Sequence, residues 1–241
     1  MIAVDVLLYK IDQKLNKLAS NEHQNIQLED KILALNEAQI QLIKNKVDGN
    51  PSGMGLDSFR KRYEDIQSLI ENHIDHPLQL TLHDAITNQW VANVHDLSPT
   101  YMFYIDSYVI ASKGRCENRT IWVNNDLAKH SDISILLTNN NYKPSFEYQE
   151  TFSVVSSDQI SIYTDGTFTP STIYIMYIRY PQYIDKGGYV KFDGTDSSDV
   201  DCELEAYMED ELLDLTVKHL AMYTENGMAM QNAQLRIQTN E

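Results

Sequence analysis

Histidine and aspartate occur in three close pairs, and their side chains are typical ligands of a catalytic metal ion. The pairs are His73 with His76, His83 with Asp84, and His95 with Asp96. Metal-dependent phosphohydrolases hold such ligands on helices, whereas the alternating apolar residues from position 78 indicate extended chain. We therefore expect these histidines to lie in loops, as capping or solvated side chains, and not to bind a metal ion. A cryptic hydrolase between residues 73 and 96, testable by the substitution His83→Ala, is kept as a third alternative.

A second candidate site is the acidic segment near the C-terminus, where ten acidic and no basic residues fall between positions 193 and 214. Carboxylates at this density attract Ca²⁺, but an EF-hand loop also needs a central glycine. The run from Asp196 to Asp201 lacks that glycine. A solvated acidic face is therefore the expected interpretation, and a specific cation site is the alternative.

The motifs of other common enzyme chemistries are missing from the sequence. It contains no GxxxxGK[ST], GxGxxG, GxSxG or HExxH pattern. Neither Cys116 nor Cys202 lies in a cationic pattern that would make a reactive thiolate, so we expect both to be small buried hydrophobic residues. The sequence predicts no catalytic residue, no cofactor, no metal ligand and no enzymatic activity.

The charge and composition exclude several classes of partner. The 241 residues include 19 basic and 35 acidic side chains, and the net charge of −16 disfavours tight binding to nucleic-acid phosphates or anionic lipids. A hydrophobic content of 42% predicts a folded protein. No apolar run approaches the roughly 20 residues of a membrane span. With two cysteines and no secretory signal, we expect a protein made in a reducing cytosol.

The N-terminal region, residues 1–76, has the apolar spacing of helices, which we place at about 3–20, 26–47 and 55–74. The first helix has an apolar arc of roughly 100°, which suits one neighbouring helix, whereas the arc of the second spans roughly 180°. We therefore expect the second helix to contact another chain as well as its neighbour. Its candidate interface residues are Leu33, Ile40 and Ile43.

From 77 to 190 the pattern changes to alternation, and eleven of the fifteen tyrosines lie between 101 and 189. Asp165-Gly166 predicts a two-residue type I′ turn that joins two strands in a hairpin. Asp126 is expected to cap a short helix from about 126 to 137. We predict a mainly antiparallel, tyrosine-rich β region.

The C-terminal region, residues 200–241, is predicted to form a helix from about 201 to 224 with two apolar faces about 180° apart. Such a helix is expected to lie between two bodies, one of them another chain. Candidate interface residues on this helix and in the tail after it are Leu213, Val217, Leu220, Met228 and Met230. Replacing Leu213 and Val217 with Asp should then abolish assembly and leave the monomer folded. The predicted class is α+β, with a helical body from both ends of the chain and the β region inserted in it.

The order of five segments resembles virion proteins of the head-to-tail connector of tailed bacteriophages, especially the crAss-like phages of Bacteroidota. The segments are LNEAQIQLIK at 35–44, FRKRYEDIQ at 59–67, KPSF at 143–146, YIRYPQYID at 177–185 and the acidic helix at 203–215. No single one of these motifs is diagnostic, and the resemblance covers most of the chain.

The resemblance implies a non-enzymatic adaptor or ring protein of the virion, present in the host cytoplasm before assembly. Copies would form a closed, twelvefold ring below the portal protein, next to other ring or tail proteins, and would continue the channel for packaged DNA. A closed ring needs two different surfaces on each subunit, in agreement with the surplus apolar helix faces. The negative charge suits a channel through which DNA slides without tight binding.

The alternative function is a β-rich carbohydrate-binding or receptor-binding module of a phage tail. Its expected binding platform is formed by the strand tyrosines Tyr101, Tyr104 and Tyr108. Glycan binding that is lost on a Tyr→Ala change would favour this alternative, whereas the ring hypothesis predicts assembly and no sugar affinity.

Overall fold

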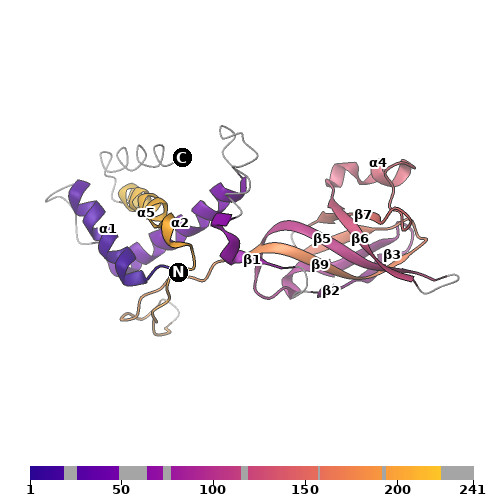
Figure 1. The fold of residues 1–241 in the computed structure, drawn as a ribbon. Helices are drawn as coiled ribbons and strands as arrows, with labels where there is room; N and C mark the ends of the chain where they lie inside the picture. Colours follow the sequence, from indigo (N-terminus) through magenta and orange to yellow (C-terminus); the bar gives the residue numbers. More distant parts are fainter. Residues whose placement is uncertain are drawn as a thin grey trace. The chain divides into compact units, whose positions relative to one another are not determined.

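The computed structural model consists of two compact units, and each is described separately (Figure 1). The helical unit comprises Met1–Leu69 and Pro181–Glu241, and the sheet unit comprises Ile70–Tyr180. The structure describes residues 1–18, 26–48, 64–72, 77–114, 119–156, 158–191 and 194–223. A mixture of helices with a large, mainly antiparallel sheet confirms the predicted class at this level.

Three helices form the core of the helical unit: α1 at Val4–Leu18, α2 at Leu28–Asp48 and α5 at Glu209–Tyr223. The 3₁₀ helix η5, Ala206–Met208, leads directly into α5. Helix α5 packs against both α1 and α2. Apolar residues at helical spacing are buried where the three helices meet. They include Leu7, Ile11, Ile32, Leu35, Leu42, Leu212, Leu213 and Leu220.

The prediction of a third helix at about 55–74 is wrong for residues 67–71. Residues 55–63, 73 and 74 lie outside the described part of the chain. The described chain forms a 3₁₀ helix, η1, at Gln67–Leu69 and then the short strand β1 at Ile70–Glu71. Ile70 pairs with Ile178 in the sheet. The hydrogen bonds of this pairing outweigh the local helical spacing, and they place the unit boundary at residue 70 rather than 76.

The sheet has nine strands in the described residues, in the order β1-β9-β5-β6-β7-β8-β4-β3, with β2 also paired to β9. All pairs are antiparallel except the parallel pair β6–β7. The remaining strands are β2 Pro77–Gln79, β3 Thr81–Asp84, β4 Gln89–Asn93, β5 Tyr101–Lys113, β6 Arg119–Leu127, β7 Glu150–Val155, β8 Gln159–Tyr163 and β9 Thr169–Arg179.

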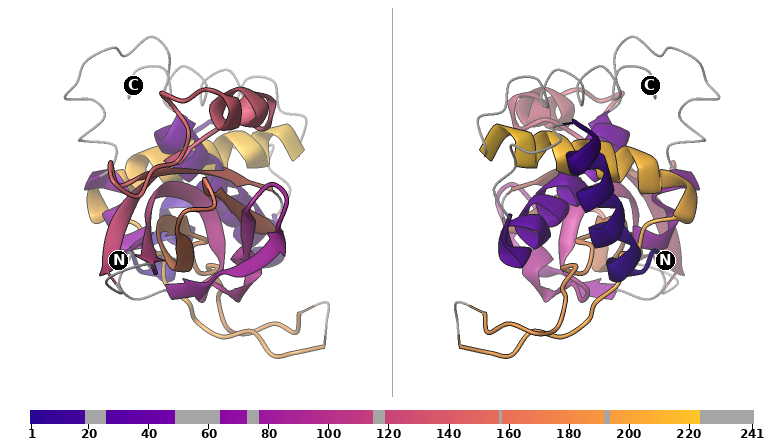
Figure 2. Two further views of the ribbon diagram at one scale, coloured as in Figure 1. Left: turned by 90° about the vertical axis from the view of Figure 1, so that its right-hand side faces the viewer. Right: turned by 90° about the vertical axis from the view of Figure 1, so that its left-hand side faces the viewer.

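The sheet curls until its two ends meet at the segment that contains β2 and β3. Strand β2 pairs with β9 and strand β3 pairs with β4, and only Leu80 separates β2 from β3. The left view of Figure 2 shows the curled sheet end-on. Side chains from β2, β4, β5, β8 and β9 share one interior core. This core includes Leu78, Ala92, Val109, Ile162, Ile173, Ile175 and Tyr177.

The predicted hairpin at Asp165-Gly166 is wrong, because strands β8 and β9 are not neighbours in the sheet. Gly166 has the expected positive φ of 78°, but Asp165 does not have the positive φ that a type I′ turn requires. The Asp165 carboxylate instead accepts hydrogen bonds from the backbone N–H and the hydroxyl of Thr167. This side-chain turn follows the end of β8. The chain then continues into β9, which pairs with β5 on the side opposite β6.

The short helix predicted from 126 to 137 begins later than expected. Asp126 lies in strand β6 and caps no helix, since its backbone pairs with Phe152 of β7. The 3₁₀ helix η4 at His130–Asp132 and the helix α4 at Ile133–Thr138 follow. Helix α4 covers one outer face of the sheet, where Leu136 packs beside Phe152.

Candidate functional site

Four of the predicted interface residues are buried inside the single chain. Ile43, Leu213, Val217 and Leu220 all have exposed fractions of 2% or less. They contact the core of the helical unit and are not available to a second copy while that core is intact. The prediction that they form an intersubunit face is therefore wrong.

Two helical neighbours explain the two apolar faces of α5. The helix packs against α2 and against α1, and each of these contacts requires its own apolar face. The sequence pattern correctly indicated a helix between two bodies, but both bodies belong to the same chain.

The other predicted interface residues have different positions. Leu33 on α2 remains 46% exposed, and Ile40 is half-buried. Met228 and Met230 lie outside the described residues. Tyr223 at the end of α5 is 49% exposed, and its hydroxyl donates a hydrogen bond to Glu37 of α2. Glu37 lies one helical turn after Leu33. We call Leu33 and Tyr223 the α2–α5 surface.

Lysines of α1 and α2 neutralise the acidic start of helix α5, so this part of the acidic segment is not a freely solvated face. Burial lowers the pKa of Lys46, but the carboxylates of Glu211 and Asp65 outweigh this effect and raise it. The buried side of the cluster includes Asp214, which has an exposed fraction of 5%. The ion pairs are Lys10–Glu209 at 2.7 Å, Lys14–Asp214 at 2.7 Å and Lys46–Glu211 at 2.9 Å.

The pairs His83–Asp84 and His95–Asp96 do not converge on a metal site in the described residues, and His73 and His76 lie outside them. Among these residues, no group of three or more His, Cys, Asp or Glu side chains is arranged to hold a metal ion. His83 lies on strand β3, and Nε2 of His95 is 3.1 Å from the Asp158 carboxylate, within hydrogen-bond distance. Cys202 is buried, and burial raises the pKa of its thiol to about 11, so the thiol is protonated at neutral pH.

Asp185 is a buried carboxylate that organises the loop before α5. It accepts hydrogen bonds from the hydroxyl of Tyr189 at 2.7 Å and the backbone N–H of Lys186 at 2.9 Å, and it pairs with the Lys191 ammonium at 2.8 Å. Burial raises the pKa of Asp185, but these three donors outweigh burial and hold the pKa below its ordinary value of 3.8. The charged carboxylate therefore stabilises the fold.

We expect the variant Asp185→Asn to lose about 1.5–3 kcal/mol of folding free energy at pH 7, because charge-assisted hydrogen bonds are lost. A carboxylate with a lowered folded pKa stabilises the protein above its unfolded pKa of 3.8, and this contribution disappears as the pH falls through the folded pKa. Urea unfolding between pH 7 and pH 3 should show the difference between wild type and variant shrinking below about pH 4. A difference that stays constant over this range would contradict the assignment.

A row of three aromatic rings lies on the outer face of the sheet unit. Tyr108 of β5 stacks on Trp122 of β6, with ring centroids 4.5 Å apart and planes 6° apart. On its other side Tyr108 stacks on Tyr174 of β9, at 5.0 Å and 12°. Trp122 is 63% exposed. We call these three residues the aromatic row.

The aromatic row differs from the tyrosine platform expected for carbohydrate binding. Tyr101 and Tyr104 pack against the interior core, and burial raises the pKa of Tyr104 to about 12. Sugars stack on open ring faces. In the aromatic row, both faces of the Tyr108 ring are already covered by Trp122 and Tyr174. The sequence predicted strands rich in aromatic residues, but it did not predict which aromatic rings stack on one another, because stacking depends on the order of the strands in the sheet.

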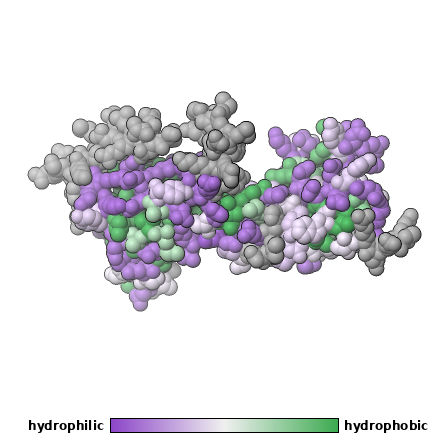
Figure 3. Space-filling view, viewed as in Figure 1, coloured by the Kyte–Doolittle hydropathy of each residue, from purple (hydrophilic) through white to green (hydrophobic). Residues whose placement is uncertain are grey.

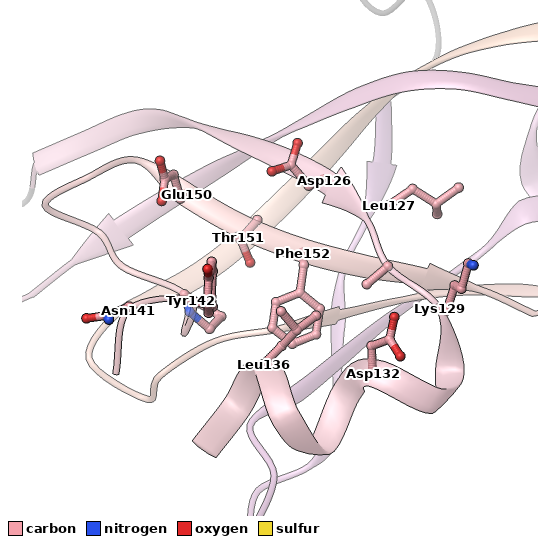
Figure 4. Close-up of a pocket in the computed structure, with 12 residues that line it drawn as sticks. Asp126, Leu127, Lys129, Asp132, Leu136, Asn141, Tyr142, Glu150, Thr151 and Phe152 are labelled. Carbon is pink, nitrogen blue, oxygen red and sulfur yellow. The ribbon is translucent and has the colours of Figure 1, made fainter. Parts of the chain in front are cut away.

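The sheet unit also contains an open cavity of about 380 Å³ below helix α4 (Figure 4). Its lining comes from the end of β6, from η4 and α4, from the segment 141–144 and from the start of β7. Phe152 and Leu136 lie at the centre of the view, and Asp126 and Glu150 lie along one side of it. None of these residues was predicted as a site, since they approach one another only through the parallel β6–β7 pair.

Apolar side chains remain on the surface of both units. Figure 3 shows hydrophobic patches on each unit among larger hydrophilic areas. None of the helices among the described residues is both long and apolar enough to cross a membrane.

Comparison with known proteins identifies no family for this chain. No protein-family model matches the sequence, and no curated protein matches it.

Proposed function

We propose that the chain is a non-enzymatic subunit of a phage head-to-tail connector ring that lies below the portal and continues the DNA channel. The proposal starts from the resemblance of the five sequence segments, in their order, to connector proteins. In this proposal, the tyrosine-rich sheet and the α2–α5 surface are the two parts that each subunit offers to its neighbours.

The observation that carries the proposal is an exposed apolar surface on each unit. The sheet unit has the aromatic row, in which Trp122 is 63% exposed. The helical unit has the α2–α5 surface, in which Leu33 is 46% exposed and Tyr223 is 49% exposed. A closed ring uses heterologous contacts, in which one surface of a subunit binds a different surface of the next. Tyrosine and tryptophan are enriched at the energetic centres of such interfaces.

The charge of the chain supports a channel rather than a DNA-binding role. The net charge is −16, and lysines of the helical unit are engaged by carboxylates of the same chain. DNA that passes such a surface releases few counterions and is therefore weakly held. We propose a twelvefold ring with DNA sliding through it, next to the portal and a further ring or tail protein.

The variant Trp122→Ala should weaken assembly about 30-fold or more, because truncation of a central interface tryptophan typically costs about 2 kcal/mol or more. Folding should change little, since the side chain is 63% exposed. Native mass spectrometry and light scattering, with the protein alone and with the portal protein of the same phage, measure the assembly. The matched control is Tyr148→Ala, which removes an 80% exposed aromatic ring of the same unit outside the row.

Two defective variants test the ring geometry. Trp122→Ala keeps an intact α2–α5 surface, and Leu33→Asp keeps an intact aromatic row. In a mixture, the intact surface of one variant can bind only the intact surface of the other, so two-chain complexes should form and no ring. A wild-type protein that stays monomeric, both alone and with the portal protein, would refute the proposal. Glycan binding that is lost with Trp122→Ala would instead favour the carbohydrate-binding alternative.

A further inference from the structure

The cavity below helix α4 has an apolar floor. Phe152 on β7 is 5% exposed and packs beside Leu136 of α4. Leu127 and Ala128, at the end of β6, also line the cavity. A ligand for this floor must carry an apolar part, which excludes a bare inorganic ion as the best fit.

The rim of the cavity is negatively charged. Asp126 is paired with Phe152 across the parallel strands β6 and β7, and Glu150 lies two residues before Phe152, so the three side chains share one face of the sheet. Asp132 contributes a third carboxylate and Lys129 one ammonium group. Three carboxylates against one ammonium group give the lining a net charge of about −2 at neutral pH.

The carboxylates nearest the floor are not neutralised by the chain itself. Within the described part of the chain, neither Asp126 nor Glu150 forms an ion pair or a side-chain hydrogen bond, and both are exposed. Carboxylates at the start of α5 differ, because lysines of the same chain neutralise them. Figure 4 shows Asp126 and Glu150 on one side of the cavity, beyond the ring of Phe152.

We propose that this cavity binds a guanidinium or ammonium group carried on a flexible aliphatic chain. The aliphatic chain would lie over Phe152 and Leu136, and the cationic head would reach Asp126 and Glu150. A cavity of about 380 Å³ lies in the range of small-ligand sites and has room for such a group. Two sources carry this chemistry: a free polyamine, or an arginine or lysine side chain of a partner protein. The inference does not depend on the ring proposal.

Methyl NMR of the full chain tests the site, because the methyl groups of Leu127, Ala128 and Leu136 report on the cavity directly. The probe is n-butylguanidinium, and its neutral isostere n-butylurea is the matched ligand control. We expect the cation to shift these methyl signals and the urea not to shift them. The double variant Asp126→Asn, Glu150→Gln should weaken binding about four- to twenty-fivefold, since each exposed charge pair contributes about two- to fivefold.

Asp158→Asn is the control variant, because it removes one exposed carboxylate of the same unit away from the cavity. Equal shifts with n-butylurea, or unchanged affinity in the double variant, would overturn the proposal. A blocked peptide with one arginine that binds as well as n-butylguanidinium assigns a partner's side chain. Binding of spermidine without binding of that peptide assigns a free polyamine.

Discussion

Replacing Leu213 with Asp should unfold the helical unit. The side chain is completely buried on α5, which packs against both α1 and α2. Truncation of a buried leucine to alanine alone costs about 2–5 kcal/mol, and a buried unpaired carboxylate costs several kcal/mol more. The total is comparable to the whole stability of many domains, which is about 5–15 kcal/mol. Circular dichroism at 222 nm during urea unfolding measures the loss of helix.

The matched control is Leu33→Asp, which introduces the same charge on a helix of the same unit. Leu33 is 46% exposed, so this variant should remain folded and lose at most about 1 kcal/mol. A folded, soluble Leu213→Asp variant would contradict the observed packing of α5. It would also restore the expectation from sequence that this face is free for another chain.

The variant Asn36→Leu should destabilise the helical unit by about 2–6 kcal/mol, although it removes a polar residue from the core. The Asn36 side chain donates to the backbone C=O of Ile184 at 2.9 Å and accepts from its N–H at 2.8 Å. Both residues are buried. Leucine would leave both backbone groups unpaired, and each unpaired buried group costs about 1–3 kcal/mol. Urea unfolding of the full chain measures the change.

Gln39, on the same helix α2, is the matched control. Its exposed fraction is 1%, its Oε1 has no hydrogen-bond partner in the described part of the chain, and its Nε2 is 4.0 Å from Cys202 Sγ. Gln39→Leu therefore loses almost no hydrogen bonding and should change stability by no more than about 1 kcal/mol, in either direction. Similar losses in both variants would show that the Asn36–Ile184 pairing is not the cause.

Local periodicity predicted the helices near the N-terminus because a helix repeats its environment every 3.6 residues. The spacing of Leu7, Ile11 and Leu15 on α1 corresponds to residues that the structure buries. The same logic predicted an apolar face at Leu213 and Val217. Periodicity reports that a face is covered, but it does not report whether the cover belongs to the same chain.

Strand partners were not predictable in the same way. Asp165-Gly166 has the composition of a hairpin turn, yet β8 pairs with β7 and β4, and β9 pairs with β5, β1 and β2. The helix predicted up to residue 74 ended early, because Ile70 joined the sheet through a partner more than a hundred residues away. Pairing energy between distant strands overrides local signals, and no local pattern encodes it.

The two candidate surfaces of the sheet unit depend on that pairing. Tyr108, Trp122 and Tyr174 are aromatic in the sequence, but they stack only because β6, β5 and β9 are adjacent. The cavity below α4 likewise depends on the parallel contact of β6 with β7. The residue types of the aromatic row and of the cavity lining can be read from the sequence, but the spatial grouping of these residues cannot.

The sequence by itself determined the acidic charge, the helical character of α1 and α2, and the presence of alternating strands in the middle of the chain. These properties follow from composition and from contacts between residues close in the chain. Only the tertiary structure decided that α5 is enclosed by its own chain, and that Leu33 and Trp122 remain exposed. Such outcomes depend on which distant segments meet, because burial and stacking are properties of the assembled neighbourhood and not of any one segment.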